Sequence, residues 1–241
     1  MLVPELSLQR IKSLAKLKQK KYRLSEKQVI VECRRTLEQL ASWGILAQEL
    51  YLGEDALPLP AYKTYSISSQ ALERICDSEH PAGLAGLFPL PQPREMDFSS
   101  AFYLDSIGDP GNMGTIFRIA AAFGIQCLLL SPECCEVSSP KVIRASLGAV
   151  YKVPYQICPL DKLKSTSAKL IALDMAGSTE LKDFCWRDTP FIIVLGSEAH
   201  GINPEIRALA DSAVRIGMPG EMESLNVAVC AGIAAYQITL T

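Results

Sequence analysis

R-I-G-M-P-G-E-M-E-S-L-N-V-A-V-C-A, residues Arg215–Ala231, is the most informative stretch of this 241-residue chain. An apolar segment at its beginning, Ala213–Ile216, predicts a strand that breaks at Gly217. The small and apolar residues of Asn226–Leu240 predict a helix, and the hydroxyl of Ser224 is suited to cap its first turn. The stretch therefore predicts a strand, a glycine turn and a buried helix in close succession.

The turn between this strand and this helix carries polar side chains beside a helix N-terminus. Unpaired backbone amides point outward at such a terminus and favour ligand binding. An ordinary glycine turn before a capped helix explains the same residues, so this stretch alone leaves both interpretations open. The polar residues are Glu221, Glu223, Ser224 and Asn226.

Upstream of this stretch, short apolar runs alternate with helical patterns. This order predicts an α/β fold with a mostly parallel sheet and helices on both faces. Ligands of such sheets bind at the carboxyl ends of the strands. The predicted strands are Ala101–Leu104, Cys127–Leu130, Leu170–Leu173, Phe191–Leu195 and Ala213–Ile216, and the predicted helices are Asn112–Phe123, Ser139–Ala149, Pro204–Leu209 and Asn226–Leu240.

Two further polar loops follow predicted strands. The first, D-P-G-N-M-G-T-I-F-R, contains Asn112 and Arg118, and the second, V-L-G-S-E-A-H-G-I, contains Gly196 and Glu198. Arg118 lies in an otherwise apolar helix, where burial would require an anion or a partner subunit. An arginine at a domain edge, paired to an acidic residue, is the alternative. Neither loop has the glycine spacing of a dinucleotide fingerprint or a P-loop.

The N-terminal third predicts a separate small α/β domain. The proline-punctuated segment L-F-P-L-P-Q-P, residues 87–93, is expected to be a linker, because proline cannot continue a helix or a central strand. We therefore predict a first domain over residues 1–90, a linker over 91–97 and a second domain over 98–241.

Charge is distributed unevenly along the chain. The net charge is −2, yet residues 1–35 contain ten basic and three acidic residues. Such a cluster can attract a polyanion. A solvated amphipathic helix, predicted over about residues 7–20, explains the cluster equally well.

Composition indicates a globular protein. Hydrophobic residues make up 49% of the chain, and no apolar run is long enough to cross a membrane. The eight cysteines include no C-x-x-C pair, so we expect no metal and a reducing, cytoplasmic location.

Taken together, the three loops resemble the SpoU family of RNA ribose 2′-O-methyltransferases, which belong to the SPOUT class. The resemblance rests on N-x-G-x-x-x-R-x-A, G-S-E-x-x-G and R-I-x-M-x-G-x-x-E-S-L-N-V-A, and it covers residues 98–241. P-K-V-I-R-A-S-L-G-A, residues 140–149, is also similar to the family. V-I-V-E-C, residues 29–33, stands where the family's N-terminal domain usually has V-E-G. Other departures are Ser197 for Asn, Ala199 for Gly and Gly217 for Pro.

The resemblance implies a C-terminal trefoil knot, S-adenosylmethionine as the cofactor, RNA as the substrate and a homodimer. It places the cofactor among backbone groups around Leu173, Gly177, Leu195, Gly196, Ile216, Met218 and Leu225. It implies that the catalytic residues are Asn112, Arg118, Glu198, Ser224 and Asn226, with Asn112 and Arg118 facing the cofactor pocket across the dimer interface.

Rival functions also fit parts of the sequence. One is an RNA-binding protein that kept the fold and lost the reaction, although the polar residues of all three loops argue against it. A nucleotide-binding dehydrogenase lacks its glycine fingerprint. A separate N-terminal domain favours ribosomal over transfer RNA, by analogy with the family.

Overall fold

The computed structural model describes residues 3–78, 81–186 and 190–240. Its contacts divide the chain into two units. Unit 1 comprises the residues up to Pro91 together with Val137–Gly148, and unit 2 comprises Gln92–Glu136 and the residues from Ala149 onward. The sequence had assigned Val137–Gly148 to the second domain. The predicted domain boundaries themselves stay a prediction.

Unit 1 is built on a mixed four-stranded sheet with the order β1-β4-β2-β3. Strand β4 is antiparallel to β1 and β2, whereas β3 is parallel to β2. The elements are α1 (Leu8–Ala15), η1 (Lys16–Lys18), α2 (Lys20–Glu26), β1 (Gln28–Glu32), α3 (Arg34–Ser42), β2 (Glu49–Leu52), β3 (Thr64–Ser66), α4 (Ser69–Ile75), β4 (Leu84–Pro89) and α6 (Pro140–Ala145).

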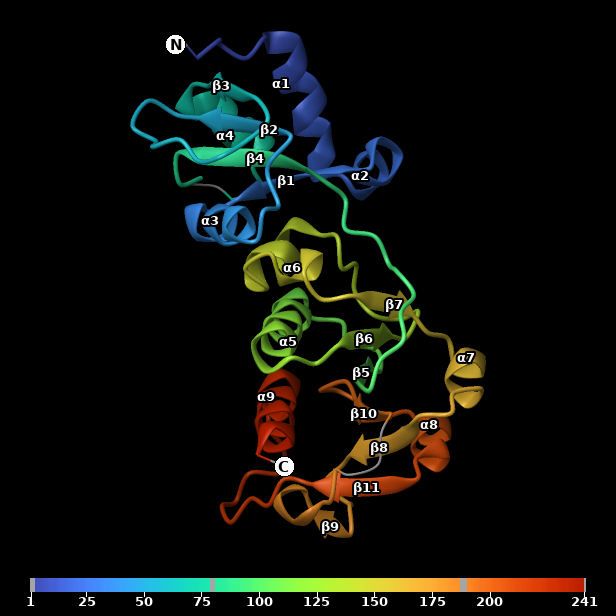
Figure 1. Ribbon diagram of the computed structural model, residues 1–241. Coiled ribbons are helices and arrows are strands. Elements are labelled where there is room, and N and C mark those ends of the chain that lie inside the picture. The colour runs from blue at the N-terminus through green and yellow to red at the C-terminus, as the bar shows by residue number, and fades with distance from the viewer. Residues whose placement is uncertain (1–2, 79–80, 187–189, 241) are drawn as a thin grey trace. The chain divides into compact units, whose positions relative to one another are not determined.

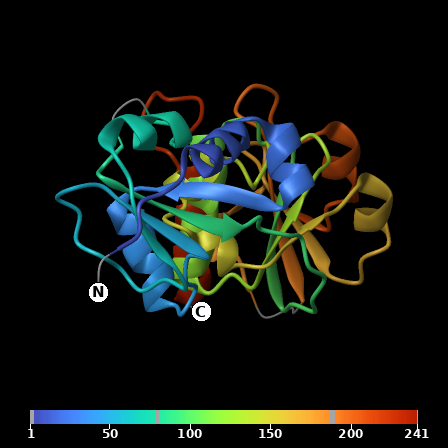
Figure 2. The same ribbon diagram turned by 90° about the horizontal axis from the view of Figure 1, so that it is seen from above.

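Apolar side chains cover both faces of this sheet. Helices α1 and α4 bury residues such as Leu14 and Leu72 against Tyr51 and Leu87 of the strands, and Figure 2 shows the two helices on the same side of the sheet. On the other face, a Cβ on Gly86 would lie 3.1 Å from the side chain of Leu37, so α3 packs closely there. Unit 1 therefore has a core of its own.

Two predictions in this region need correction. The helix predicted over about residues 7–20 is interrupted at Gln19, whose extended backbone separates η1 from α2. The segment 87–93, expected to be a linker, begins within the sheet, because Leu87, Phe88 and Pro89 belong to the inner strand β4, whereas the linker predicted over 91–97 stays a prediction. Pro89 is the last residue of that strand, where its missing N–H leaves the interior of the ladder intact.

Unit 2 contains a wholly parallel seven-stranded sheet with the order β7-β6-β5-β10-β8-β11-β9. This confirms the predicted α/β fold with a mostly parallel sheet. The elements are β5 (Ser100–Leu104), α5 (Pro110–Phe123), β6 (Cys127–Leu130), η2 (Ala149–Tyr151), β7 (Tyr155–Ile157), α7 (Leu160–Lys164), β8 (Lys169–Leu173), β9 (Thr179–Glu180), η3 (Leu181–Asp183), β10 (Phe191–Leu195), α8 (Pro204–Leu209), β11 (Ser212–Arg215) and α9 (Val227–Thr239).

Helices cover both faces of the parallel sheet. Figure 1 shows α5 and α9 side by side on one face and α7 and α8 on the other. Leu163 of α7 and Ile206 of α8 pack against Tyr103 and Val194 of the central strands. The strand order brings the segments after β5, β10 and β11 to the same edge of the sheet, which is the carboxyl end of all three strands.

Side-chain caps set the starts of the two long helices of unit 2. Asp109 accepts a hydrogen bond from the Asn112 amide, so α5 begins at Pro110, two residues before the predicted start. Asn226 caps α9 by accepting from the amides of Ala228 and Val229. The prediction that Ser224 is this cap is therefore wrong; an asparagine two residues later fills the position with equally suitable geometry.

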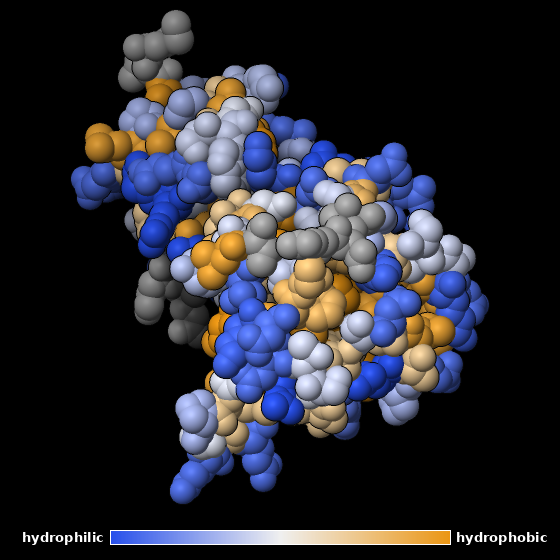
Figure 3. Space-filling view, turned by 60° about the horizontal axis from the view of Figure 1, so that its bottom comes forward, coloured by the Kyte–Doolittle hydropathy of each residue, from blue (hydrophilic) through white to orange (hydrophobic). Residues whose placement is uncertain are grey.

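The described residues contain no helix that is both long and apolar enough to cross a membrane. Figure 3 shows hydrophobic residues interspersed with hydrophilic ones on the face in view. Large apolar side chains are also exposed on α9 and at its C-cap, namely Val229, Ile233, Tyr236 and Leu240.

Candidate active site

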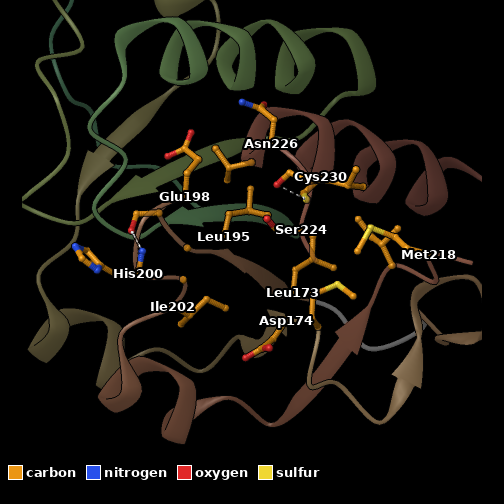
Figure 4. A pocket seen from close by; sticks show the side chains of 17 residues that line it. Leu173, Asp174, Leu195, Glu198, His200, Ile202, Met218, Ser224, Asn226 and Cys230 are labelled. Carbon is orange, nitrogen blue, oxygen red and sulfur yellow. Dashed lines mark hydrogen bonds between the residues drawn. The ribbon is translucent and has the colours of Figure 1, made fainter. Parts of the chain in front are cut away.

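A cavity of about 510 Å³ lies in unit 2 at the carboxyl ends of the strands. Binding sites for small molecules commonly have volumes in this range. In Figure 4, Glu198 and Asn226 lie on the side of the cavity nearest α5, whereas Asp174 lies at the opposite end. The lining residues are Leu173, Asp174, Met175, Leu195, Gly196, Ser197, Glu198, His200, Gly201, Ile202, Ile216, Met218, Ser224, Leu225, Asn226, Val227 and Cys230.

The loop after β10 folds back on itself tightly. Ser197 and Gly201 exchange two backbone hydrogen bonds, of 3.1 and 2.9 Å, which bring the returning chain against Gly196. A Cβ on Gly196 would lie 2.2 Å from the carbonyl carbon of Gly201 and 2.3 Å from the amide nitrogen of Ile202. Only glycine fits here, because the atoms it would meet belong to the backbone.

A chain of hydrogen bonds joins the three polar loops. The Asn226 side chain, which caps α9 through Oδ1, donates through Nδ2 to Oδ1 of Asn112 at 2.9 Å. The Nδ2 group of Asn112 in turn donates to Oε1 of Glu198. In each of these two side-chain amides, the carbonyl oxygen accepts a hydrogen bond and the NH₂ group donates one. The arrangement orients the Glu198 carboxylate beside the cavity.

The buried carboxylate of Asp105 contacts two of these loops. Asp105, directly after β5, is 4% exposed and accepts a 2.6 Å hydrogen bond from the backbone amide of Asn203. Its other oxygen accepts from the hydroxyl of Ser106, whose φ of 58° lies in the left-handed region. Because a buried carboxylate needs such partners, Asp105 holds the loops after β5 and β10 together.

The other end of the cavity is shaped by β8 and β11. Asp174 forms a 2.9 Å ion pair with Arg207 of α8 and accepts from the amide of Ala176. Gly177 does not line the cavity. A Cβ there would lie 2.6 Å from the carbonyl carbon of Val214, so Gly177 allows the turn after β8 to approach β11.

Arg118 lies two helical turns beyond the start of α5 and does not line the cavity. Its side chain is exposed, and no hydrogen bond or ion pair joins its guanidinium to any residue among those described. The alternative of an arginine paired to an acidic residue is thus not observed among the described residues, and contact with an anion or a partner subunit stays a prediction. An exposed cation without a partner is available to an anionic ligand.

Cys230 is the thiol that lines the cavity. Burial raises the pKa of this thiol, and its sulfur lies 3.8 Å from the carbonyl oxygen of Leu225. A thiol with a raised pKa stays protonated at neutral pH and is a weak nucleophile. The lining therefore offers no activated cysteine for covalent chemistry.

The structure brings most of the residues predicted for the site together. Six of the seven predicted cofactor contacts line the cavity, and Gly177 is the exception. Of the predicted catalytic residues, Glu198, Ser224 and Asn226 line it, and Asn112 is bonded to two of these. The roles of all these residues remain predictions.

Sequence reasoning missed Asp105 and Asp174. Both directly follow a strand whose carboxyl end faces the site, which is a signal that could have identified them. Their partners, the amide of Asn203 and the side chain of Arg207, come from distant parts of the sequence and could not be inferred.

Comparison with known proteins places these features in a family. The model of the SpoU rRNA Methylase family matches residues 99–236, and that of the MRM3-like substrate binding domain matches residues 9–86. The 23S rRNA (guanosine(2553)-2′-O)-methyltransferase RlmP of Bacillus subtilis is 25% identical, over 95% of this chain and 96% of that protein.

Solved structures agree in fold over nearly the whole chain. An RNA 2′-O ribose methyltransferase superposes with a TM-score of 0.83 at 26% identity, covering 100% of this chain and 98% of that one. The AdoMet-bound rRNA methyltransferase from Sinorhizobium meliloti gives a TM-score of 0.81 at 23% identity, covering 98% of this chain and 97% of that one. The family model matches residues 99–236, which are more than half of this chain. The chain therefore belongs to the SpoU rRNA methylase family.

Proposed function

We propose that the protein transfers a methyl group from S-adenosylmethionine to a ribose 2′-hydroxyl of RNA. The observation that carries this proposal is the hydrogen-bonded chain of Asn226, Asn112 and Glu198, which places three polar groups at one end of a cavity built from three loops. Membership of the family and the names of the relatives support it. An RNA-binding protein without activity is the alternative, and no observation favours it.

The cavity is suited to S-adenosylmethionine in size and in chemistry. Apolar side chains such as Leu173, Leu195 and Ile216 provide surface for an adenine ring, and the turn at Gly196 exposes backbone groups for polar contacts. We assign the cofactor to this cavity, with Leu173, Leu195, Gly196, Ile216, Met218 and Leu225 around it and Gly177 shaping the turn behind.

The bound cofactor supplies an electrophilic methyl group on a sulfonium, so the protein must mainly align a ribose oxygen with it. Ser224 and Asn226 line the cavity near the Glu198 end and are placed to orient the hydroxyl. Glu198, held by Asn112, fixes the loop geometry. Arg118 is assigned to a phosphate of the substrate and to the charge that develops on the attacking oxygen.

We favour ribosomal RNA over transfer RNA as the substrate. The similarity of residues 9–86 to a substrate binding domain and the activity named for RlmP support this choice. The basic residues of the N-terminal segment would attract the RNA.

The test measures transfer of a tritiated methyl group from S-adenosylmethionine to purified rRNA and tRNA. Labelled RNA is then hydrolysed with alkali, since a 2′-O-methyl group prevents cleavage of the adjacent phosphodiester. We expect label in alkali-resistant dinucleotides from rRNA. Label in single nucleotides would contradict the ribose target, and RNA binding without label would favour the inactive alternative.

We also propose the trefoil knot and a homodimer that uses α9. The return of the chain from β11 past the cavity to α9, which packs beside α5, supports the knot. Val229, Ile233, Tyr236 and the C-cap residue Leu240 are spaced four, three and four residues apart, so their exposed side chains form one apolar stripe along α9 and its C-terminus. Such a stripe is typical of an interface.

The apolar stripe gives a prediction about assembly. Ile233→Glu places a charge in the proposed interface and is expected to weaken dimerisation by about 2 kcal/mol or more, since a buried unpaired charge is costly. Thr239→Glu, exposed on the same helix, is the control. Sedimentation velocity and methyl transfer are measured over a dilution series. A monomeric Ile233→Glu variant with full activity would contradict a site shared between subunits.

The N-terminal basic cluster gives a prediction about RNA affinity. Lys16 and Lys21 both lie over the ring of Tyr22, at 5.7 and 4.8 Å, which keeps two cations close together. Replacing four lysines by glutamine should reduce the slope of log affinity against log salt by about 0.7–0.9 for each phosphate that the variant no longer neutralises. The four lysines are Lys16, Lys18, Lys20 and Lys21.

The matched control carries the same charge change in unit 2, at Lys152, Lys162, Lys164 and Lys169. Filter binding of rRNA fragments at several salt concentrations measures both slopes. Equal slopes for the wild type and the N-terminal variant would show that the cluster is only a solvated face.

A further inference from the structure

Two segments that resemble the family, but that the proposed site does not use, meet in unit 1. Glu32 belongs to V-I-V-E-C at the end of β1, and Arg144 belongs to P-K-V-I-R-A-S-L-G-A in α6. The guanidinium of Arg144 donates through Nη1 to Oε1 of Glu32 at 2.5 Å. Residues 112 positions apart are thus joined by an ion pair.

The acidic partner of this pair is buried and fully engaged. Glu32 is 4% exposed, and its carboxylate also accepts from the backbone amide and the hydroxyl of Ser78, the latter at 2.6 Å. Burying a carboxylate without such partners costs free energy. Removing one partner of a buried ion pair is therefore strongly destabilising, because the other charge stays buried without compensation. Arg144 is the more exposed member, with 39% of its side chain accessible.

The rest of the Arg144 segment is shaped to fit the same surface. Val142 and Ile143 are buried, and the hydroxyl of Ser146 bonds the carbonyl oxygen of Ile143. Gly148 has a φ of +81°, and a Cβ there would lie 2.7 Å from the side chain of Leu40 in α3. Arg144 and Gly148 of the R-A-S-L-G sequence therefore fit against β1 and α3, respectively.

This docking changes how the chain connects the two units. Unit 1 is joined to unit 2 after Pro91, and the chain re-enters it at Val137 and leaves again after Gly148. The segment before Val137 is itself fixed within unit 2, because the amide of Cys135 donates to the carbonyl oxygen of Ile107 in the loop that precedes α5. Three covalent crossings thus replace the single one at Pro91.

We propose that Glu32 and Arg144 are positioning residues that couple the RNA-binding unit to the catalytic unit; this inference rests on the proposed function. While the ion pair holds α6 in unit 1, the chain passes between the units at three points, and these connections keep the effective concentration of bound RNA at the active site high. If α6 is released, residues 137–148 no longer bind to the rest of unit 1. Unit 1 is then attached mainly through the chain after Pro91. Each unit then binds its own ligand, but transfer is slow.

The experiment compares Arg144→Met with Arg144→Lys, which keeps the cation. Three quantities are measured: the S-adenosylmethionine Kd by calorimetry, the rRNA Kd by filter binding, and the single-turnover rate of methyl transfer. For Arg144→Met we expect a rate about tenfold lower, with both Kd values within about twofold of wild type. Arg144→Lys should recover most of the rate.

Glu38→Gln is the matched control, because Glu38 forms an exposed ion pair with Arg34 in the same unit. Glu32→Gln replaces Arg144→Met if the latter fails to fold by circular dichroism. A wild-type rate for these variants, or a loss of rate matched by a loss of cofactor affinity, would overturn the inference. Failure of the proposed function would differ, since the wild-type protein itself would transfer no methyl group to RNA.

Discussion

Arg118→Ala is expected to lower the rate of methyl transfer by about 10²–10³-fold while the affinity for S-adenosylmethionine changes little. Losses of this size are typical when one group that stabilises developing charge is removed. The affinity should survive because Arg118 does not line the cavity, and its exposed side chain bonds to none of the described residues. Single-turnover kinetics and calorimetry measure the two quantities separately.

Arg118→Lys distinguishes between the roles open to this side chain. A guanidinium does not give up its proton in proteins, so Arg118 is not expected to be the general base. Lysine keeps the charge but loses the planar fork that contacts a phosphate through two N–H groups. We expect activity between those of the wild type and Arg118→Ala. Near-wild-type turnover of Arg118→Ala would exclude both roles.

The fold of unit 2 could be predicted largely from its sequence, because the pattern that defines it is local. Cys127–Leu130, Phe191–Leu195 and Pro204–Leu209 are bounded as predicted, since glycine, proline and charged residues flank short apolar or helical runs. Strands β7 and β9 were missed. They have three and two residues, too few to show a periodicity, and pairing with the inner strands β6 and β11 stabilises them.

The errors occurred where tertiary contacts decide between local alternatives. The segment 139–149 reads as one helix, yet α6 ends at Ala145. Leu147 and Gly148 adopt left-handed φ angles, and Gly148 packs against Leu40. Either Ser224 or Asn226 can cap α9 by its chemistry. The hydrogen bond from Asn226 to Asn112, on another helix, is available only to the second of them.

The candidate site could be predicted as a set of loops but not as a set of contacts. Parallel strands bring the segments after β5, β10 and β11 to one edge, so the three polar loops were expected there. The resemblance, however, placed Asn112 across a dimer interface, whereas the structure bonds it to Glu198 and Asn226 of its own chain. Which amide donates to which carboxylate depends on positions that no spacing in the sequence reveals. The hydrogen bond from the Asn203 amide to the buried Asp105 could not be predicted for the same reason.

Gly196→Ala is expected to have the second large effect, on cofactor binding rather than on the chemical step. The added methyl group would lie 2.2–2.4 Å from the backbone of Gly201 and Ile202, and backbone atoms cannot rotate away as a side chain can. The loop after β10 must therefore shift, at a cost of about 1–3 kcal/mol or more. Since residues 196–198 and 200–202 of this loop line the cavity, we expect S-adenosylmethionine affinity to fall about 100-fold.

Gly220→Ala is the matched control, because a Cβ on Gly220 would meet no atom within 4 Å. Calorimetry with S-adenosylmethionine and thermal unfolding are measured for both variants. Wild-type cofactor affinity in Gly196→Ala would mean that the cofactor does not depend on this turn, and the assignment of the cavity would fail. The two large predictions also separate binding from chemistry: Gly196→Ala should lose the cofactor, whereas Arg118→Ala should keep it and still not transfer the methyl group.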